Sequence, residues 1–128
     1  MAKEPSAFSW QKRLKSFSYA GDGLKALLKT EHNAYIHTAF TIMALVLAIV
    51  LHISRIEWMI LVLAIALVWM TEIINTALEK TMDLISEEYH PIIKQVKDLA
   101  AAAVLIASLS AVIIGVIIFA PKLLVYFL

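Results

Sequence analysis

The stretch from residue 72 to residue 83 reads Glu-Ile-Ile-Asn-Thr-Ala-Leu-Glu-Lys-Thr-Met-Asp and follows an uncharged run, residues 58–71. Its amide and acidic residues are spaced by three, four and four positions: Glu72, Asn75, Glu79 and Asp83. Side chains with this spacing lie on one face of an α-helix, so they form a single polar column. A carboxylate placed in hydrocarbon costs about 2.5–3.5 kcal/mol on insertion scales. We therefore expect polar groups opposite the column and interpret it as a candidate functional site.

The composition around this stretch is unusually apolar. Of 128 residues, 62% are hydrophobic, and the mean hydropathy is +0.85, whereas soluble domains are about 45–50% apolar. This predicts an all-α integral membrane protein that forms one domain over residues 1–128. The net charge of +1 gives no indication of a nucleic-acid partner. The chain has no cysteine, and neither a P-loop nor a Rossmann glycine motif occurs in it.

Four helical segments are predicted along the chain. Residues 8–29 alternate apolar and basic side chains, which is typical of an amphipathic helix lying in the membrane interface. Gly21-Asp22-Gly23 is expected to interrupt this helix with a bend. Three apolar segments then predict transmembrane helices over residues 35–53, 57–86 and 92–121.

Short polar segments are expected to separate these helices. Residues 30–33 resemble a helix cap and turn, and Pro91, at the end of a loop over residues 87–91, is expected to stop helix continuation before the last span. His37 and His52 fall near the two ends of the first span, so we interpret them as interfacial residues that tolerate substitution by glutamine.

The positive charges predict the orientation. Only Arg55 and Lys122 fall on one side of a three-span topology. The other lysines and arginines fall on the opposite side: Lys3, Lys12, Arg13, Lys15, Lys25, Lys29, Lys80, Lys94 and Lys97. The positive-inside rule places that side, with the N-terminus, in the cytoplasm.

The residues alone leave three functions open. Carboxylates and lysines at the cytoplasmic boundary suit phosphoryl transfer from a soluble nucleotide to a lipid, since carboxylate oxygens bind Mg²⁺ and lysine neutralises phosphate. Glu72 alone would equally suit a small proton-coupled transporter. A structural subunit, whose polar residues only join helices, is the third possibility.

Three motifs together resemble the signature of the prokaryotic diacylglycerol kinase family: residues 72–83, Glu88-Tyr89-His90 and Lys97-Asp98. The resemblance extends from about Lys12 to Pro121. It implies a small three-span lipid kinase that forms homotrimers in the bacterial inner membrane, with active sites shared between subunits. It also implies Mg²⁺ as cofactor and ATP as co-substrate.

Within this family, the chain looks more like the Gram-positive undecaprenol kinase branch. The connection over residues 52–58 and the segment Glu88-Tyr-His-Pro carry that resemblance. It implies phosphorylation of undecaprenol to undecaprenyl phosphate. Phosphorylation of diacylglycerol to phosphatidic acid is the alternative.

The resemblance further implies roles for single residues. Glu72 matches the family's proposed general base, and Glu31 and Glu79 match carboxylates that hold the divalent ion. The matching nucleotide contacts are Lys12, Arg13, Tyr19, Glu31, Glu79, Asp83, Glu88, His90, Lys97 and Asp98. The matching substrate or site-lining positions are Gly23, Asn75 and Ala101. Ala101 stands where the family often has serine, and the basic N-terminal position falls on either Lys12 or Arg13.

Overall fold

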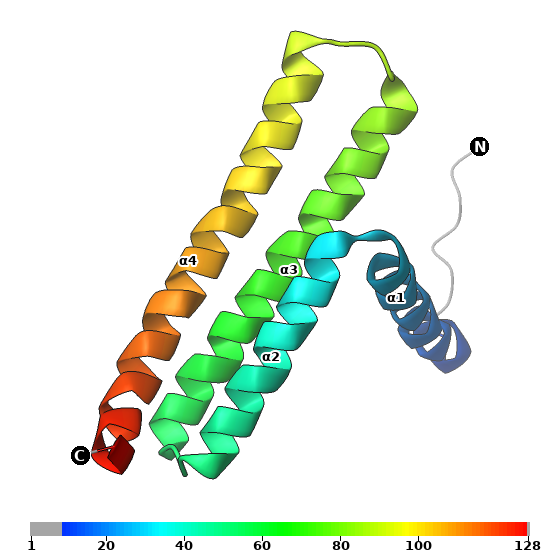
Figure 1. Cartoon of the computed structure of the whole chain (residues 1–128). Helices are drawn as coiled ribbons and strands as arrows, with labels where there is room; N and C mark the ends of the chain where they lie inside the picture. The colour runs from blue at the N-terminus through cyan, green and yellow to red at the C-terminus, as the bar shows by residue number, and fades with distance from the viewer. Residues whose placement is uncertain (1–8, 128) are drawn as a thin grey trace.

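The computed structural model describes residues 9–127, and in this range the chain forms four α-helices (Figure 1). They are α1 (Trp10–Thr30), α2 (His32–Val50), α3 (Arg55–Ile85) and α4 (Pro91–Phe127). Helices α2, α3 and α4 are long and apolar enough to cross a membrane. Figure 1 shows these three helices running up and down beside one another, with α1 to one side of the bundle. The predicted all-α fold with three spans is confirmed.

Helix α1 differs from the sequence-based prediction at its glycines. The helix continues through Gly21-Asp22-Gly23, and neither glycine has a positive φ. No atom lies within 4 Å of a Cβ built at either position, so neither glycine serves a close approach. The predicted bend is therefore wrong. A glycine inside a helix costs only about 1 kcal/mol relative to alanine, which a helix of 21 residues tolerates.

Helix α4 also extends further than predicted. The third span was expected to end at Pro121, but the helix runs through this residue to Phe127. Proline removes its own backbone N–H and therefore a single helical hydrogen bond. In a strongly apolar segment the remaining backbone groups are best satisfied by continuing the helix. Lys122, in the added turn, reaches back to Glu57 at the start of α3, with Nζ and Oε1 3.1 Å apart.

The turn between α2 and α3 combines two helix caps. The N–H of Ile53 donates to the Ala48 carbonyl and that of His52 to the Ile49 carbonyl, each at 3.2 Å. With His52 at φ 49°, these bonds form a Schellman motif that ends α2. Ser54 then caps α3, because its hydroxyl accepts from the Glu57 N–H while the Glu57 carboxylate accepts from the Ser54 N–H.

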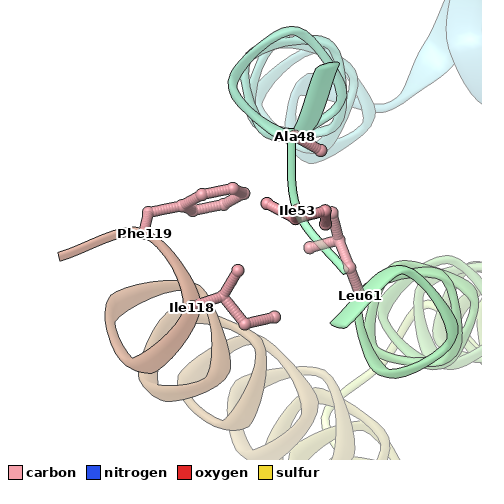
Figure 2. Close-up of a cluster of buried hydrophobic side chains, with 5 residues drawn as sticks. All are labelled: Ala48, Ile53, Leu61, Ile118 and Phe119. Carbon is pink, nitrogen blue, oxygen red and sulfur yellow. The ribbon is translucent and has the colours of Figure 1, made fainter. Parts of the chain in front are cut away.

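A buried apolar cluster holds this end of the bundle together (Figure 2). Figure 2 shows its side chains converging from α2, the turn, α3 and α4: Ala48, Ile53, Leu61, Ile118 and Phe119. Ala48 and Ile53 are also the two residues that the Schellman hydrogen bond joins, so the cap and the core stabilise each other.

The opposite end of the molecule is built by α3 and α4 alone. Their connection, residues 86–90, lies well beyond the start of α2 (Figure 1). The short junction between α1 and α2, by contrast, meets α3 part-way along its length (Figure 1). Glu31 makes this junction, since its backbone serves as the C-cap of α1 and the N-cap of α2. Asp83 on α3 therefore lies between the α1–α2 junction, which meets Lys80, and the α3–α4 connection, whereas Glu72 lies further into the bundle against His37 of α2.

Candidate active site

Glu72 is the largest fully buried side chain among the described residues. The residue is 1% exposed, although it lies on α3 immediately after an uncharged run. Its Oε2 atom lies 3.4 Å from Nε2 of His37 on α2. Neither atom makes a hydrogen bond, so the two groups face each other as a close but unformed pair. A buried carboxylate without a hydrogen-bonded partner is costly, which favours a functional role over a structural one.

The His37 side chain is held by aromatic and polar contacts between α2 and α3. Its ring meets Trp69 edge to face, with ring centroids 6.2 Å apart. The Trp69 indole N–H in turn donates to the Thr41 hydroxyl at 3.1 Å, which joins α3 to α2. The His37 side chain is only 13% exposed, whereas the sequence predicted an interfacial residue. The difference arises because Trp69 and Glu72, one turn of α3 apart, cover its ring.

Unpartnered polar atoms concentrate around this turn of α3. Over the described range, four of the five buried side-chain atoms that lack a hydrogen-bond partner belong to His37, Glu72, Asn75 and Thr76. Most buried polar groups in proteins are satisfied, so a group of exceptions marks a place where substrate or water completes the bonding. This turn is therefore the centre of the candidate site.

Glu79 and Glu31 approach the site from two sides. Glu79 lies one turn beyond Asn75, whose amide donates to it at 3.1 Å. Glu31, at the α1–α2 junction, lies 3.5 Å from Nζ of Lys80. Lys80 also donates to Thr30 at 3.2 Å, so the junction packs against the α3 turn that follows Glu79.

No group of three histidine, aspartate or glutamate side chains able to hold a metal ion occurs within residues 9–127. The carboxylates of Glu31 and Glu79 are both partly exposed. Carboxylate oxygens are the ligands that Mg²⁺ prefers, and Mg²⁺ usually retains several waters or phosphate oxygens beside one or two protein carboxylates. The donor set therefore fits Mg²⁺ only in company with a phosphorylated ligand.

Charged residues of the α3–α4 end form two ion pairs. Asp83 pairs with Lys97 across the two helices, and Lys94 pairs with Asp98 along α4. The predicted residues Glu88 and His90 lie in the connection and are exposed. The backbone N–H of Glu88 donates to Ser86, and Nδ1 of His90 accepts from the Ile92 N–H, so local bonds fix the loop.

The four residues of the polar column do lie on one face of α3, but they contact different neighbours. Glu72 faces His37 on α2, Glu79 bonds Asn75 within α3, and Asp83 meets Lys97 on α4. Ala101 on α4 is exposed. The predicted site residues on α1 are exposed as well: Lys12, Arg13, Tyr19 and Gly23. Within one chain the structure sets His37 against Glu72, Lys97 against Asp83, and Glu31 against Lys80. It leaves the outer face of α1 apart from them.

A groove runs along the bundle, and its wall includes His37, which faces Glu72. It holds about 440 Å³ and is almost entirely apolar. Its wall comes from α2, α3 and α4, as shown by His37, Phe40, Leu61, Val68, Val112 and Phe119. Ser108 also lines it, and the Ser108 hydroxyl has no hydrogen-bond partner. An apolar groove of this kind is a place where a hydrocarbon chain can bind.

Comparison of the sequence with known protein families identifies the family of this chain. The sequence model of the prokaryotic diacylglycerol kinase family matches residues 18–119. The chain belongs to the prokaryotic diacylglycerol kinase family. It is therefore a lipid kinase and a multi-pass membrane protein, and the transporter hypothesis is not supported.

Relatives of this lipid kinase carry two names. The chain is 42% identical over 109 residues to the undecaprenol kinase of Bacillus subtilis, covering 85% of this chain and 89% of that protein. It is 40% identical over 112 residues to a diacylglycerol kinase of Synechocystis, covering 87% and 64%. It is 34% identical over 113 residues to the Escherichia coli diacylglycerol kinase, covering 88% and 91%.

Sequence reasoning missed two side chains that lie against the candidate site: His37 faces Glu72, and Trp69 packs against His37. A weak signal was present, because His37 and Thr41 are four residues apart on one helix while Trp69 and Glu72 are three apart on the next. Both pairs place polar or amphipathic groups on one face of an apolar helix. The sequence did not reveal that these two faces meet.

Proposed function

We propose that this lipid kinase transfers the γ-phosphoryl group of ATP to the hydroxyl of undecaprenol, giving undecaprenyl phosphate and ADP. The observation that carries the proposal is the burial of Glu72 with an unpartnered carboxylate oxygen that faces His37, a residue in the wall of an apolar groove. In this proposal Glu72 accepts the hydroxyl proton as the oxygen attacks phosphorus, and the bond between the γ-phosphorus and the ADP oxygen breaks.

The groove supports a lipid substrate with a long hydrocarbon chain. Its apolar wall would hold several isoprene units of the alcohol, and its head beside His37 would leave the hydroxyl near Glu72. The polar turn would thus bind the hydroxyl end of the substrate, and the groove would bind its hydrocarbon chain. The Bacillus subtilis relative bears the name undecaprenol kinase, which favours a polyprenyl alcohol.

Glu31 and Glu79 would hold Mg²⁺ together with the ATP phosphates. When bound, the ion would neutralise charge on the phosphates and orient them. Lys97 and either Lys12 or Arg13 would supply further positive charge, because lysine and arginine are the usual protein groups on phosphate. Remaining nucleotide contacts would come from Tyr19, Asp83, Glu88, His90 and Asp98, with Gly23, Asn75 and Ala101 lining the site.

Assembly and orientation complete the proposal. The outer face of α1 lies apart from the α3 column in a single chain, so a homotrimer with sites shared between subunits would supply groups that one chain does not bring together. With α1 in the membrane interface, the lysine-rich side and the N-terminus would face the cytoplasm, where ATP is present. In a bacterium, the membrane of this proposal is the inner membrane, which borders the cytoplasm.

Diacylglycerol is the second candidate substrate, because the Synechocystis and Escherichia coli relatives are named diacylglycerol kinases. The two candidates are separated by incubating the purified protein in micelles with Mg²⁺, γ-labelled ATP and an equimolar mixture of undecaprenol and diacylglycerol. Label mainly in undecaprenyl phosphate is the expected result. Label mainly in phosphatidic acid would replace the substrate assignment, and label in neither lipid would overturn the proposed function.

A further inference from the structure

We propose that His37 is a positioning residue that holds the Glu72 carboxylate in place during phosphoryl transfer. The proposal rests on the function proposed above for Glu72 and adds a residue from another helix to the site. Its starting point is the pair of facing atoms, Nε2 of His37 and Oε2 of Glu72, which are 3.4 Å apart and otherwise unpartnered.

The geometry fits a hydrogen bond that forms when substrate binds. A formed N–H···O bond is about 2.9–3.0 Å long, so a small rotation of either side chain closes the remaining gap. Hydrogen bonds in ligand-free active sites are often long and tighten in the substrate complex. An imidazole with its proton on Nε2 would then donate to Oε2, leaving Oε1 free to accept the proton of the lipid hydroxyl.

Other contacts limit where the imidazole can point. Trp69 packs edge to face against the ring, and Trp69 is itself anchored to α2 by its bond to Thr41. Trp69 and Glu72 lie three residues apart and therefore on the same face of α3. Trp69 packs against the His37 ring, and Glu72 faces the Nε2 atom of that ring. A rigid donor is useful here, because misplacing a reacting group by about 1 Å can cost about 100-fold in rate.

The matched variants are H37Q and H37N. A glutamine amide reaches approximately the place of the imidazole Nε2, whereas an asparagine amide is one methylene shorter and falls short of Glu72. H37N is expected to lower kcat by about 10–100-fold with the KM for ATP unchanged, and H37Q to stay within about threefold of the natural protein. H52Q, at an exposed histidine in the α2–α3 turn, serves as the control for replacing a histidine.

A double-variant measurement separates positioning from general packing. Because His37 acts through Glu72, adding H37N to an E72Q protein should cause no further loss of residual rate. Helix content and elution volume are compared first, and H37L takes the place of H37N if the latter does not fold. Equal activity of H37N and natural protein, equal loss in H37N and H37Q, or an additive loss in E72Q would each overturn the proposal.

These outcomes are distinct from a failure of the proposed function. If the natural protein labels no lipid, or if E72Q retains normal turnover, the proposed role of Glu72 is lost. If the natural protein is active, E72Q is inactive and H37N is normal, only the role of His37 is lost.

Discussion

At the scale of single residues, the most informative side chain is a carboxylate that the fold does not satisfy. Glu72 is almost completely buried, and its Oε2 atom has no hydrogen-bond partner. Burying a carboxylate without a hydrogen-bonded partner is costly, so stability alone would favour leucine at this position. The residue is better explained by a reaction that needs a base beside a lipid.

The E72Q variant tests this directly. Glutamine is nearly the same shape but does not accept a proton, so the helices should pack as before while the general base is lost. We expect kcat to fall by about 10²–10⁴-fold, measured as initial rate of lipid phosphorylation in micelles. Unchanged circular dichroism and elution volume serve as the control for folding. Turnover within a few-fold of the natural protein would show that another group takes the proton.

The carboxylates of Glu31 and Glu79 give a second prediction, since we assign them to Mg²⁺. Replacing either with alanine should raise the Mg²⁺ concentration for half-maximal rate by about tenfold or more, because each removes a charged oxygen ligand. The measurement is a Mg²⁺ titration of the initial rate at fixed ATP. E87A, at an exposed glutamate of the α3–α4 connection, is the control. A Mg²⁺ dependence equal to that of the E87A protein would remove the residue from the metal site.

At the scale of elements, the apolar runs predicted the three spans, because hydrophobic length and charge-free sequence are properties of a single segment. The ends of the helices were less predictable. Whether α4 ends at Pro121 depends on contacts with other helices. The ion pair between Lys122 and Glu57 is such a contact, and hydrophobic periodicity does not predict it. The glycines of α1 likewise permit a bend without requiring one.

The end of α2 supplies the prediction at this scale. His52 has φ 49°, a left-handed conformation that costs residues other than glycine about 1–2 kcal/mol. H52G should therefore raise the free energy of unfolding by about 0.5–1 kcal/mol, whereas H52V should lower it by about 1 kcal/mol, because β-branched residues fit this region poorly. Denaturation with sodium dodecyl sulfate in micelles provides the measurement. Similar effects of the two variants would show that the turn does not keep this conformation.

At the scale of the whole molecule, the sequence predicted which polar residues share a helix face, but not which residues of other helices they meet. Glu72, Asn75, Glu79 and Asp83 follow from helical spacing alone. Their partners come from other helices, since His37 is supplied by α2 and Lys97 by α4. Contacts between helices depend on register and crossing, which one segment does not encode. The assignment of single roles therefore rested on the family resemblance.

A site shared between subunits makes a prediction about mixtures. If the residues on α1 and α3 of one site come from two copies, then E72Q subunits and subunits carrying both K12A and R13A, each of low activity alone, should regain activity when they are mixed and reassembled. The mixed trimer would contain some sites with neither change. The measurement is the initial rate after unfolding and refolding the mixture in detergent, compared with each variant treated in the same way. No recovery would indicate that each site is built from one chain.

The length of α3 and α4 has a consequence for the surrounding bilayer. With 31 and 37 residues, these continuous helices are about 46 Å and 56 Å long, whereas a hydrocarbon layer is about 30 Å thick. Because neither helix is broken, the distance along the bundle axis between Glu72 and the α2–α3 turn is fixed. A thicker or thinner bilayer must therefore be met by tilting or by local deformation of the lipid. The depth at which a lipid headgroup meets Glu72 thus depends on membrane thickness as well as on the protein.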